Sequence, residues 1–238
     1  NDSTPTITGT AEAGAAVTVT VTDPASTEVI SQTVVADGSG NWTLAITTPL
    51  TVNGTYTVDV SAVDKAGNTA TDTGSFDFDD TVPAATPDLL ATSDSAGAGT
   101  SGTTSDDYTK DQTPTFEVAT GEPAGAAVLV EVLDNLGAVI GAHTTTTQTD
   151  AAGKISFTPG SNLAAGDYTL RVTPTDKAGN TGTAATLAFT VDTSTTTAYT
   201  GIADDTFGAD TTGTASDKLS NDSTPTITGT AEAGAAVT

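Results

Sequence analysis

Acidic residues recur along this chain in two patterns whose spacing could hold a metal ion. The first is Asp64-Lys-Ala-Gly-Asn68, which returns as Asp176-Lys-Ala-Gly-Asn180. A tight turn would by itself account for the Gly and the Asn of this pattern. The second pattern lies in a loop of roughly 20 residues without predicted secondary structure, a length typical of functional or disordered segments. Aligning Pro114 with Pro225 superposes its aspartates: Asp94 on Asp205, Asp106 on Asp217, and Asp111 on both Asp222 and Asp2.

Carboxylates spaced in this way favour a hard cation. Calcium takes about six to eight oxygen ligands in adaptable geometry, whereas magnesium demands stricter octahedral placement. A module of seven antiparallel strands ends at the pole where its acidic loop lies. We therefore expect three acidic segments to converge on each junction: the acidic loop, the acids that follow the last strand, and the turn of the next module. Glu122 and Asp150 are expected at the same pole as that turn. We predict Ca²⁺ as the cofactor, with ligands drawn from Asp64, Asn68, Asp79, Asp80, Asp94, Asp106, Asp111, Asp176, Asn180, Asp192, Asp205, Asp217 and Asp222.

The calcium prediction has one alternative, a solvated acidic surface that maintains solubility. The chain has neither a DxDxDG loop with a Glu at its twelfth position nor a GGxGxD nonapeptide, the two standard calcium signatures. The prediction therefore rests on internal repetition and on strand order.

Residues for catalysis are scarce. His143 is the only histidine; it lies in a run of threonines, has no counterpart in the first half of the chain, and is expected to be a solvent-facing strand residue. The chain contains no cysteine, no phosphate-cradling glycine loop before a helix, and no histidine cluster for zinc or iron. Paired acids could cleave glycosides, but a duplicated array without insertions offers no cleft for the sugar. We expect no enzymatic activity.

The charge balance narrows the class of partner. Asp plus Glu number 30 against 6 Lys plus Arg, which gives a formal net charge of −24. Nucleic acid and anionic membrane surfaces are poor partners for such a chain, and its self-repulsion makes cations important for folding. No apolar run approaches the length of a membrane helix, and no signal peptide opens the chain. An extracellular module without cysteines needs a stiffener other than disulfides.

The chain is repetitive. The stretch NDSTPTITGTAEAGAAVT fills residues 1–18 and returns unchanged at 221–238, and a weaker copy begins at Asp111. The repeating module is therefore about 110 residues long, large enough to bury its own core. Neither end of the chain reads as the natural end of a module.

Period-2 alternation rich in Val, Ile, Thr and aromatic residues predicts strands and no helix. Val17, Val19 and Val21 are expected on one face of their strand, and Val128, Val130 and Val132 repeat them in the second copy. Trp42, Leu44, Ile46, Phe76 and Phe78 complete a two-sheet core, with Ile155, Phe157, Phe189 and Val191 as counterparts. The predicted strands of the first copy are 5–11, 16–23, 28–35, 41–47, 54–63 and 69–78.

After an even number of antiparallel strands, the chain leaves a module at the same end at which it entered. Modules that follow one another head to tail therefore require a seventh strand. The candidates lie upstream of each Thr-Pro-Thr segment, at 87–92 and 198–203. We predict an all-β fold of tandem seven-stranded Greek-key Ig-like sandwiches: 1–80 lacking its first strand, 81–192 complete, and 193–238 holding the first two strands and the start of the third. Neighbouring repeats are the expected partners, and the free strand of one molecule is expected to complement the open edge of another.

The run at 221–238, DGSGNW at 37–42, NGTYTV at 53–58 and DKAGNT at 64–69 resemble bacterial immunoglobulin-like repeats. Such repeats form the extender regions of giant repeats-in-toxin adhesins that type I systems secrete to the cell surface. The resemblance implies a non-enzymatic stalk, stiffened by calcium at module junctions through Asp64, Asp176, Asp79, Asp80, Asp192 and the loop acids, and holding a distal binding domain away from the cell. The second copy departs from the pattern, because DAAGKI at 150–155 lacks the Trp and Gly121-Glu-Pro replaces GTAE.

Two other functions stay open at this stage. The Thr-rich outward face could bind a sugar or ice, although Thr favours strands in any case. The chain could also be an Ig-like accessory domain of a surface hydrolase.

Overall fold

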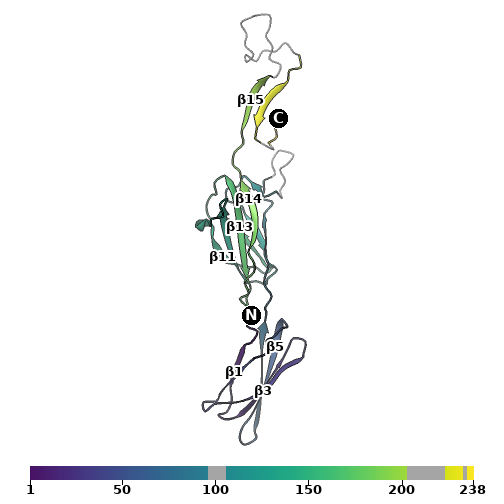
Figure 1. Ribbon diagram of the computed structural model, residues 1–238, viewed down its shortest axis with the longest axis vertical. Helices are drawn as coiled ribbons and strands as arrows, with labels where there is room; N and C mark the ends of the chain where they lie inside the picture. The colour runs from purple at the N-terminus through teal and green to yellow at the C-terminus, as the bar shows by residue number, and fades with distance from the viewer. Residues whose placement is uncertain (96–105, 203–222, 233–234) are drawn as a thin grey trace.

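The computed structural model describes residues 1–95, 106–202, 223–232 and 235–238. The described residues form two β-sandwiches arranged end to end, followed by a two-stranded hairpin (Figure 1). The expected all-β fold is confirmed, and the one departure is a short 3₁₀ turn at Gly141–His143. No helix in the described part of the chain is long and apolar enough to cross a membrane.

The first module, residues 1–80, consists of a two-stranded and a four-stranded sheet. The two-stranded sheet pairs β1 (Thr6–Thr10) with β4 (Asn41–Ala45), and the four-stranded sheet has the order β3-β2-β5-β6. The remaining bounds are β2 Ala16–Thr22, β3 Glu28–Val35, β5 Gly54–Val63 and β6 Thr69–Phe78. All six predicted strands are present, because each alternates apolar and polar residues over its length.

The core of the first module lies between its two sheets. Val17, Val19 and Val21 are fully buried on one face of β2, as the alternation predicts. Trp42 and Leu44 reach them from the opposite sheet. Tyr56 stacks on Phe76, with ring centroids 5.4 Å apart, and meets the ring of Phe78 edge-on.

The second module is a fuller sandwich of three and five strands, in the orders β12-β9-β7 and β11-β10-β13-β14-β8. The predicted first strand is β7, shorter than expected because a turn begins at Leu90. The two-residue strand β8, which pairs in parallel with β14, was not predicted. The bounds are β7 Thr86–Leu89, β8 Tyr108–Thr109, β9 Phe116–Ala119, β10 Ala127–Asp134, β11 Thr145–Gln148, β12 Lys154–Phe157, β13 Gly166–Thr175 and β14 Ala185–Val191.

The third segment holds β15 (Thr197–Ile202) and β16 (Ile227–Ala231), which pair antiparallel. A β-bulge interrupts the ladder between Tyr199 and Gly201. β15 is the strand that the sequence places at 198–203, upstream of the repeated Thr-Pro-Thr segment.

The prediction for His143 is wrong. The side chain is only 5% exposed and ends the 3₁₀ turn between β10 and β11 instead of facing solvent from a strand. The bridge between Leu133 and Val139 and the bond from the Ile140 amide to the Val132 carbonyl fold this connection back onto β10. His143, which begins the run of threonines, is therefore buried although Thr144 to Thr146 after it are exposed, and local sequence does not reveal this.

Candidate cation-binding sites

Many of the aspartates form one recurrent turn. In each case one carboxylate oxygen accepts the backbone amides two and four residues ahead, as Asp37 Oδ1 does from Ser39 and Asn41 at 2.8 and 2.9 Å. The residue three positions ahead has a positive φ, which explains the glycine usually found there. The same pairs of amides bind Asp23, Asp64, Asp134 and Asp150. In each of these turns between strands, one carboxylate oxygen is therefore already engaged by the backbone of its own turn.

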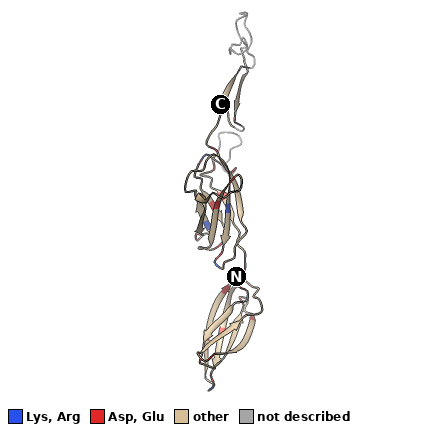
Figure 2. Cartoon of the chain, turned by 60° about the vertical axis from the view of Figure 1, so that its left-hand side comes forward, with Lys and Arg blue, Asp and Glu red and all other residues tan. Residues whose placement is uncertain are grey.

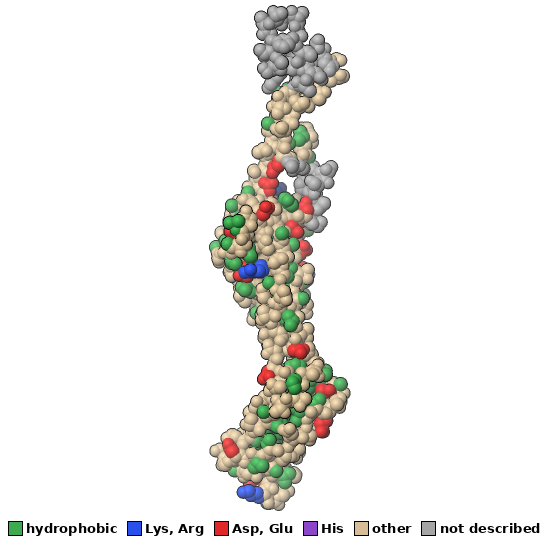
Figure 3. Space-filling view, viewed as in Figure 1, with side chains coloured by type: hydrophobic (Ala, Val, Ile, Leu, Met, Phe, Trp, Pro, Cys, Tyr) green, Lys and Arg blue, Asp and Glu red, His purple; other side chains and the backbone are tan. Residues whose placement is uncertain are grey.

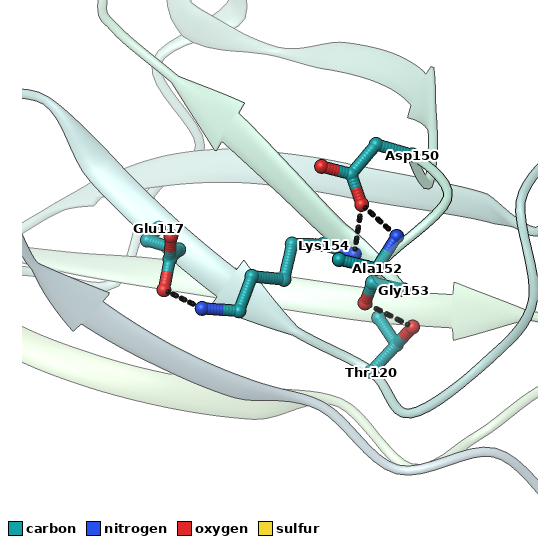
Figure 4. A network of polar contacts seen from close by, with 6 residues as sticks. All are labelled: Glu117, Thr120, Asp150, Ala152, Gly153 and Lys154. Atoms are coloured by element: carbon teal, nitrogen blue, oxygen red, sulfur yellow. Dashed lines mark hydrogen bonds and ion pairs between the residues drawn. The ribbon is translucent and has the colours of Figure 1, made fainter.

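The Asp150 turn, drawn in Figure 4, shows what such a carboxylate does. Asp150 Oδ1 accepts the amides of Ala152 and Lys154, and Thr120 donates its hydroxyl hydrogen to the Gly153 carbonyl at 3.0 Å. Lys154 Nζ lies 2.6 Å from Glu117 Oε1 on the neighbouring strand. Asp150 lies at the predicted pole, but its carboxylate caps its own turn.

The two DKAGN turns share one geometry. Asp64 Oδ2 accepts a hydrogen bond from Asn68 Nδ2 at 2.6 Å, and Asp176 Oδ2 accepts one from Asn180 Nδ2 at 2.7 Å. The Asn68 side chain, followed by the Asn68 amide, holds the pKa of Asp64 below its ordinary value. Burial opposes this effect at Asp176, but the hydrogen bonds from Asn180 outweigh it and the pKa of Asp176 is also lowered.

The surroundings of the two turns differ. In the first module, β5 pairs Gly54 with Phe78 at one end and Val63 with Thr69 at the other, so the Asp64 turn and the linker lie at opposite ends. In the second module the corresponding turn faces that linker: Asn180 Nδ2 also donates to the Asp79 carbonyl at 2.9 Å. The structure thus brings together Asp79, Asp176 and Asn180, three of the predicted ligands, and leaves Asp64 and Asn68 far from them.

The linker after Phe78 is held on both sides. On the first module, Asn53 Oδ1 accepts the Asp80 amide at 3.1 Å and Asn53 Nδ2 donates to Thr81 Oγ1 at 2.7 Å. On the second module, the Pro83 carbonyl lies against Gly182, at a place where a Cβ would collide with it. The N-terminal residue also lies at this junction, with the Asn1 amino group 3.5 Å from the Ala178 carbonyl (Figure 1). The linker is therefore docked, not a loose tether.

Glu122 adds a third acid to the junction. Burial, and then the charges of Asp176 and Asp79, raise the pKa of Glu122. Three acids of two modules therefore lie close enough for their charges to repel one another. Glu122 was expected at this pole but was not among the predicted ligands.

The junction offers the type of oxygen that calcium prefers, namely carboxylates and a main-chain carbonyl. In this conformation the acids do not surround one point: no three His, Cys, Asp or Glu side chains in the described ranges are grouped so that they could hold a metal ion. The Asn180 amide nitrogen instead bridges the Asp176 carboxylate and the Asp79 carbonyl. The oxygen ligands at the junction thus fit a calcium ion. In this conformation the Asn180 amide nitrogen occupies the position between the Asp176 carboxylate and the Asp79 carbonyl.

A second acidic group lies in the loop between β7 and β9. Asp94 is only 4% exposed, its Oδ2 lies 3.4 Å from the Asp107 amide, and its Oδ1 has no partner among the described residues. Burial is the main cause that raises the pKa of Asp94, and the charge of Asp106 adds to it. Burial, followed by the charges of Asp94, Asp88 and Asp106, likewise raises the pKa of Asp107. A buried carboxylate of this kind is costly unless a proton or a cation neutralises it.

Sequence reasoning found Asp94 and Asp106 but missed Asp88 and Asp107. Their places in the third segment hold Tyr199 and Lys218, so internal repetition gives no signal for them. Asp107 has a positive φ of 60°, unusual for a residue other than glycine, and only the folded loop shows it.

The remaining predicted ligands have local roles or lie outside the described chain. Asp111 accepts hydrogen bonds from Ser93 Oγ and from the Thr113 amide, and the equivalent Asp2 accepts the Thr4 amide. Asp192 Oδ1 accepts the Ser194 amide at 3.1 Å, as Asp79 accepts that of Thr81. The Asp80 amide binds Asn53, as described above. Asp205, Asp217 and Asp222 lie outside the described residues.

The distribution of acidic residues over the molecule includes both acidic groups, the junction around Asp176 and the loop around Asp94. Acidic residues are spread over both modules and basic residues are few (Figure 2). Figure 3 shows acidic side chains at the neck between the two modules and again around the far end of the second module.

A family model for the bacterial Ig-like domain matches the chain twice, over residues 1–80 and 81–193. The chain belongs to the bacterial Ig-like domain family. The two matched units of this Ig-like chain are the two sandwiches described above, and the matched family is one of Ig-like domains rather than of catalytic domains. Among curated proteins, none matches the chain.

Solved structures resemble the chain over most of its length. A tetra-tandem repeat in the extending region of a large adhesion protein is 27% identical, with 86% of this chain and 49% of that chain covered and a TM-score of 0.41. A 1.5-MDa bacterial ice-binding adhesin is 22% identical, with 86% and 63% covered and a TM-score of 0.40. The fibronectin(III)-like modules of Clostridium thermocellum CbhA are 15% identical, with 80% and 86% covered and a TM-score of 0.35. The chain thus spans about half of the first of these structures.

Proposed function

We propose that this chain is a non-enzymatic extender of a bacterial surface adhesin, in which calcium at the module junctions makes the array a stiff rod. The observation that carries the proposal is the docked junction, where Asn180 of the second module holds the Asp79 carbonyl of the linker beside Glu122 and Asp176. The rod would hold a distal ligand-binding domain away from the cell, and type I secretion would deliver it to the surface.

Calcium would act as the bridge between the two modules. Asp176 and Glu122 would supply carboxylate oxygens and Asp79 its main-chain oxygen. Asn180 would present its amide oxygen after a rotation about its terminal bond. When bound, the ion supplies the positive charge that offsets the mutual repulsion of these groups. Without it, the linker keeps one bridging hydrogen bond against three facing acids, and the junction becomes easier to bend.

The group around Asp94 is the second proposed calcium site. Its carboxylates come from the loop that lies beside the exit of β14, since the Asp192 amide donates to the Thr109 carbonyl at 2.8 Å. A cation here would fix this loop at the end of the module that leads into the third segment. Asp94 and Asp106 are the proposed ligands from the sequence, with Asp107 and Asp88 added by the structure.

The Thr-rich face has a simpler explanation than ligand binding. The hydroxyls of Thr18 and Thr33 hydrogen-bond to each other across β2 and β3 at 2.9 Å. Cross-strand Thr pairs of this type stabilise a sheet by themselves. No described contact favours the sugar, ice or accessory-domain alternatives over the spacer.

The two DKAGN turns provide the test, because they are the same turn in two surroundings. We would compare Asp176→Asn with Asp64→Asn by thermal unfolding and small-angle X-ray scattering, each with calcium and with excess chelator. Both variants lose the same turn carboxylate, so the difference between them reports the junction. We expect calcium to raise Tm and lengthen the particle in the native chain and in Asp64→Asn, and to have much less effect on Asp176→Asn. Equal calcium responses of the two variants would refute a junction site.

A further inference from the structure

Asn53 and Gly54 form the only Asn-Gly pair in the chain. In such a pair the asparagine side chain can cyclise onto the backbone nitrogen of the next residue, because glycine has no side chain that blocks the approach. Asn53 is exposed directly before β5, so water reaches the pair. The pair therefore has the composition and the access that spontaneous deamidation requires.

Both residues of the pair have a structural role. Gly54 has a φ of +132°, and a Cβ there would lie 2.9 Å from Pro24 Cγ, so a side chain at this position would be strained and crowded. Asn53 holds the linker: its Oδ1 accepts the Asp80 amide at 3.1 Å and its Nδ2 donates to Thr81 Oγ1 at 2.7 Å. The reactive pair thus lies at the point where the first module binds the linker.

The second module keeps the glycine and lacks the asparagine. Gly166 starts β13 as Gly54 starts β5, but Ala165 precedes it. Ala165 has no side-chain amide that could bind the residues after β14 or cyclise. The strand itself therefore does not need an asparagine before it, and the role of Asn53 in the first module is its contact with the linker.

We propose that Asn53 is a deamidation site and that the docked linker controls the rate of the reaction. Ring closure brings Asn53 Cγ to bonding distance of the Gly54 nitrogen, and a side chain that is bonded to the linker through both polar atoms resists this movement. The backbone beside it is fixed as well, since the Val52 carbonyl accepts the Tyr56 hydroxyl at 2.9 Å. Asn53 therefore reacts in the fraction of molecules whose linker has left the first module.

The reaction needs only water as a co-reactant. The Gly54 nitrogen attacks Asn53 Cγ, the bond between Cγ and Nδ2 breaks, and Nδ2 leaves as ammonia with the proton of the Gly54 amide. Water then opens the resulting succinimide at one of its two carbonyl carbons. Attack at Cγ gives aspartate in an unchanged backbone, and attack at the main-chain carbonyl gives isoaspartate, whose backbone runs through Cγ.

Either product weakens the contact with the linker. Both replace the Nδ2 donor that binds Thr81 by a carboxylate oxygen, and both add a negative charge beside the linker acids Asp79 and Asp80, which repel it. Isoaspartate also lengthens the backbone directly before the first pair of β5 and β6 and shortens the side chain. Because neither product returns to asparagine, deamidation makes the junction permanently more flexible.

The consequence for a stiff rod rests on the proposed function, but the reaction itself does not depend on calcium. Asn53 binds the linker from the first module, whereas Asn180 binds it from the second, beside Asp176 and Glu122. With excess chelator present throughout, the reaction and its effect on the linker are measured without calcium. The two proposals can therefore fail separately.

Peptide mapping by mass spectrometry during incubation at mildly alkaline pH tests the control by the linker. Thr81→Val removes the acceptor of Asn53 Nδ2 and keeps the shape of the side chain. Thr73→Val is the control, because it removes a likewise exposed hydroxyl of the first module that binds Asp59 instead. We expect Asn53 to deamidate roughly fivefold faster in Thr81→Val than in the native chain and in Thr73→Val, since one lost hydrogen bond changes the open fraction by about that factor. Equal rates in the two variants, or an Asn53 that stays intact in both, would overturn the proposal.

Anion exchange of the incubated native chain gives a matched pair for the effect on the linker. Mass spectrometry identifies the fraction deamidated at Asn53 alone, and the intact fraction of the same incubation is its control. In small-angle X-ray scattering with excess chelator, we expect a broader distribution of interatomic distances for the deamidated fraction. Identical scattering curves would show that Asn53 does not hold the linker and would also overturn the proposal.

Discussion

The two sandwiches share six corresponding strands, and the second has two more. Both bury a Val triplet on one strand and aromatic rings opposite it. The second adds β7 and β8 where the first has a groove between β1 and β6. The difference teaches that the six shared strands suffice to build a core, and that β7 and β8 cover its edge in the second module.

The two DKAGN turns also differ between the modules, in the charged groups around them. Asp64 and Asp176 make the same hydrogen bonds, and only the second turn has a linker next to it. Within this chain the same repeated turn thus has one geometry in two different surroundings. Each prediction below changes one module and uses the other as its reference.

The largest effect should follow from Leu89→Ala, which removes the side chain that seals the second module. Truncating a fully buried Leu typically costs about 2 to 5 kcal/mol. We expect the second module to unfold at lower urea concentration by circular dichroism, while the Trp42 fluorescence transition of the first module stays in place. Val82→Ala, at an exposed linker position, is the control. A shift of the Trp42 transition by the same amount would show that the two modules do not unfold independently.

A reciprocal change should partly close the first module. Gly74 occupies the place that Leu187 holds in the second module, where Leu187 packs against the core. Gly74→Leu is expected to raise the free energy of unfolding of the first module by about 1 to 2 kcal/mol, because the new side chain fills empty apolar space. The measurement is urea unfolding followed by Trp42 fluorescence. Ser75→Leu on the exposed face of the same strand is the control, and an equal gain there would mean that the groove is irrelevant.

Comparing Asn180→Ala with Asn68→Ala should distinguish the role of the Asn side chain in its turn from its role at the junction. Each variant loses the bond between the Asn side chain and its Asp. Only Asn180→Ala also loses the bond to the Asp79 carbonyl. We expect similar small losses of module stability in the two variants, but a broader distribution of interatomic distances in small-angle scattering for Asn180→Ala alone. Identical scattering curves would mean that the amide does not fix the linker.

The smallest effect should be a pH dependence at the junction. The folded-state pKa of Glu122 lies above its ordinary value of 4.5, so the folded chain keeps a proton that the unfolded chain has lost. In chelator, Glu122 therefore destabilises the native chain increasingly as pH rises from 4.5 through the raised pKa.

The variant Glu122→Gln removes this titration. It should match the native chain at pH values below 4.5 and exceed it in Tm at neutral pH. Glu12→Gln, an exposed acid of the first module, serves as the control. A native chain that gains stability relative to Glu122→Gln as pH rises would contradict the raised pKa.

The sequence by itself determined the strands and the core. Alternation, as in β2 and β5, leaves one face apolar whatever the rest of the chain does. The predicted bounds 28–35, 54–63 and 69–78 match β3, β5 and β6 to the residue. The duplicated stretch at 1–18 likewise fixed the modular design. The expectation that residues 1–80 lack their first strand came from strand parity and stays a prediction.

Only the tertiary structure decided which acids face one another. Most aspartates that recur in the sequence satisfy their own turns, because an amide two residues away is always closer than a carboxylate of another module. The junction of Asp79, Asp176, Asn180 and Glu122 depends on the docking of two modules, and the burial of Asp94 and His143 depends on long connections folding back on a sheet. These contacts join residues that are far apart along the chain, so no local pattern encodes them.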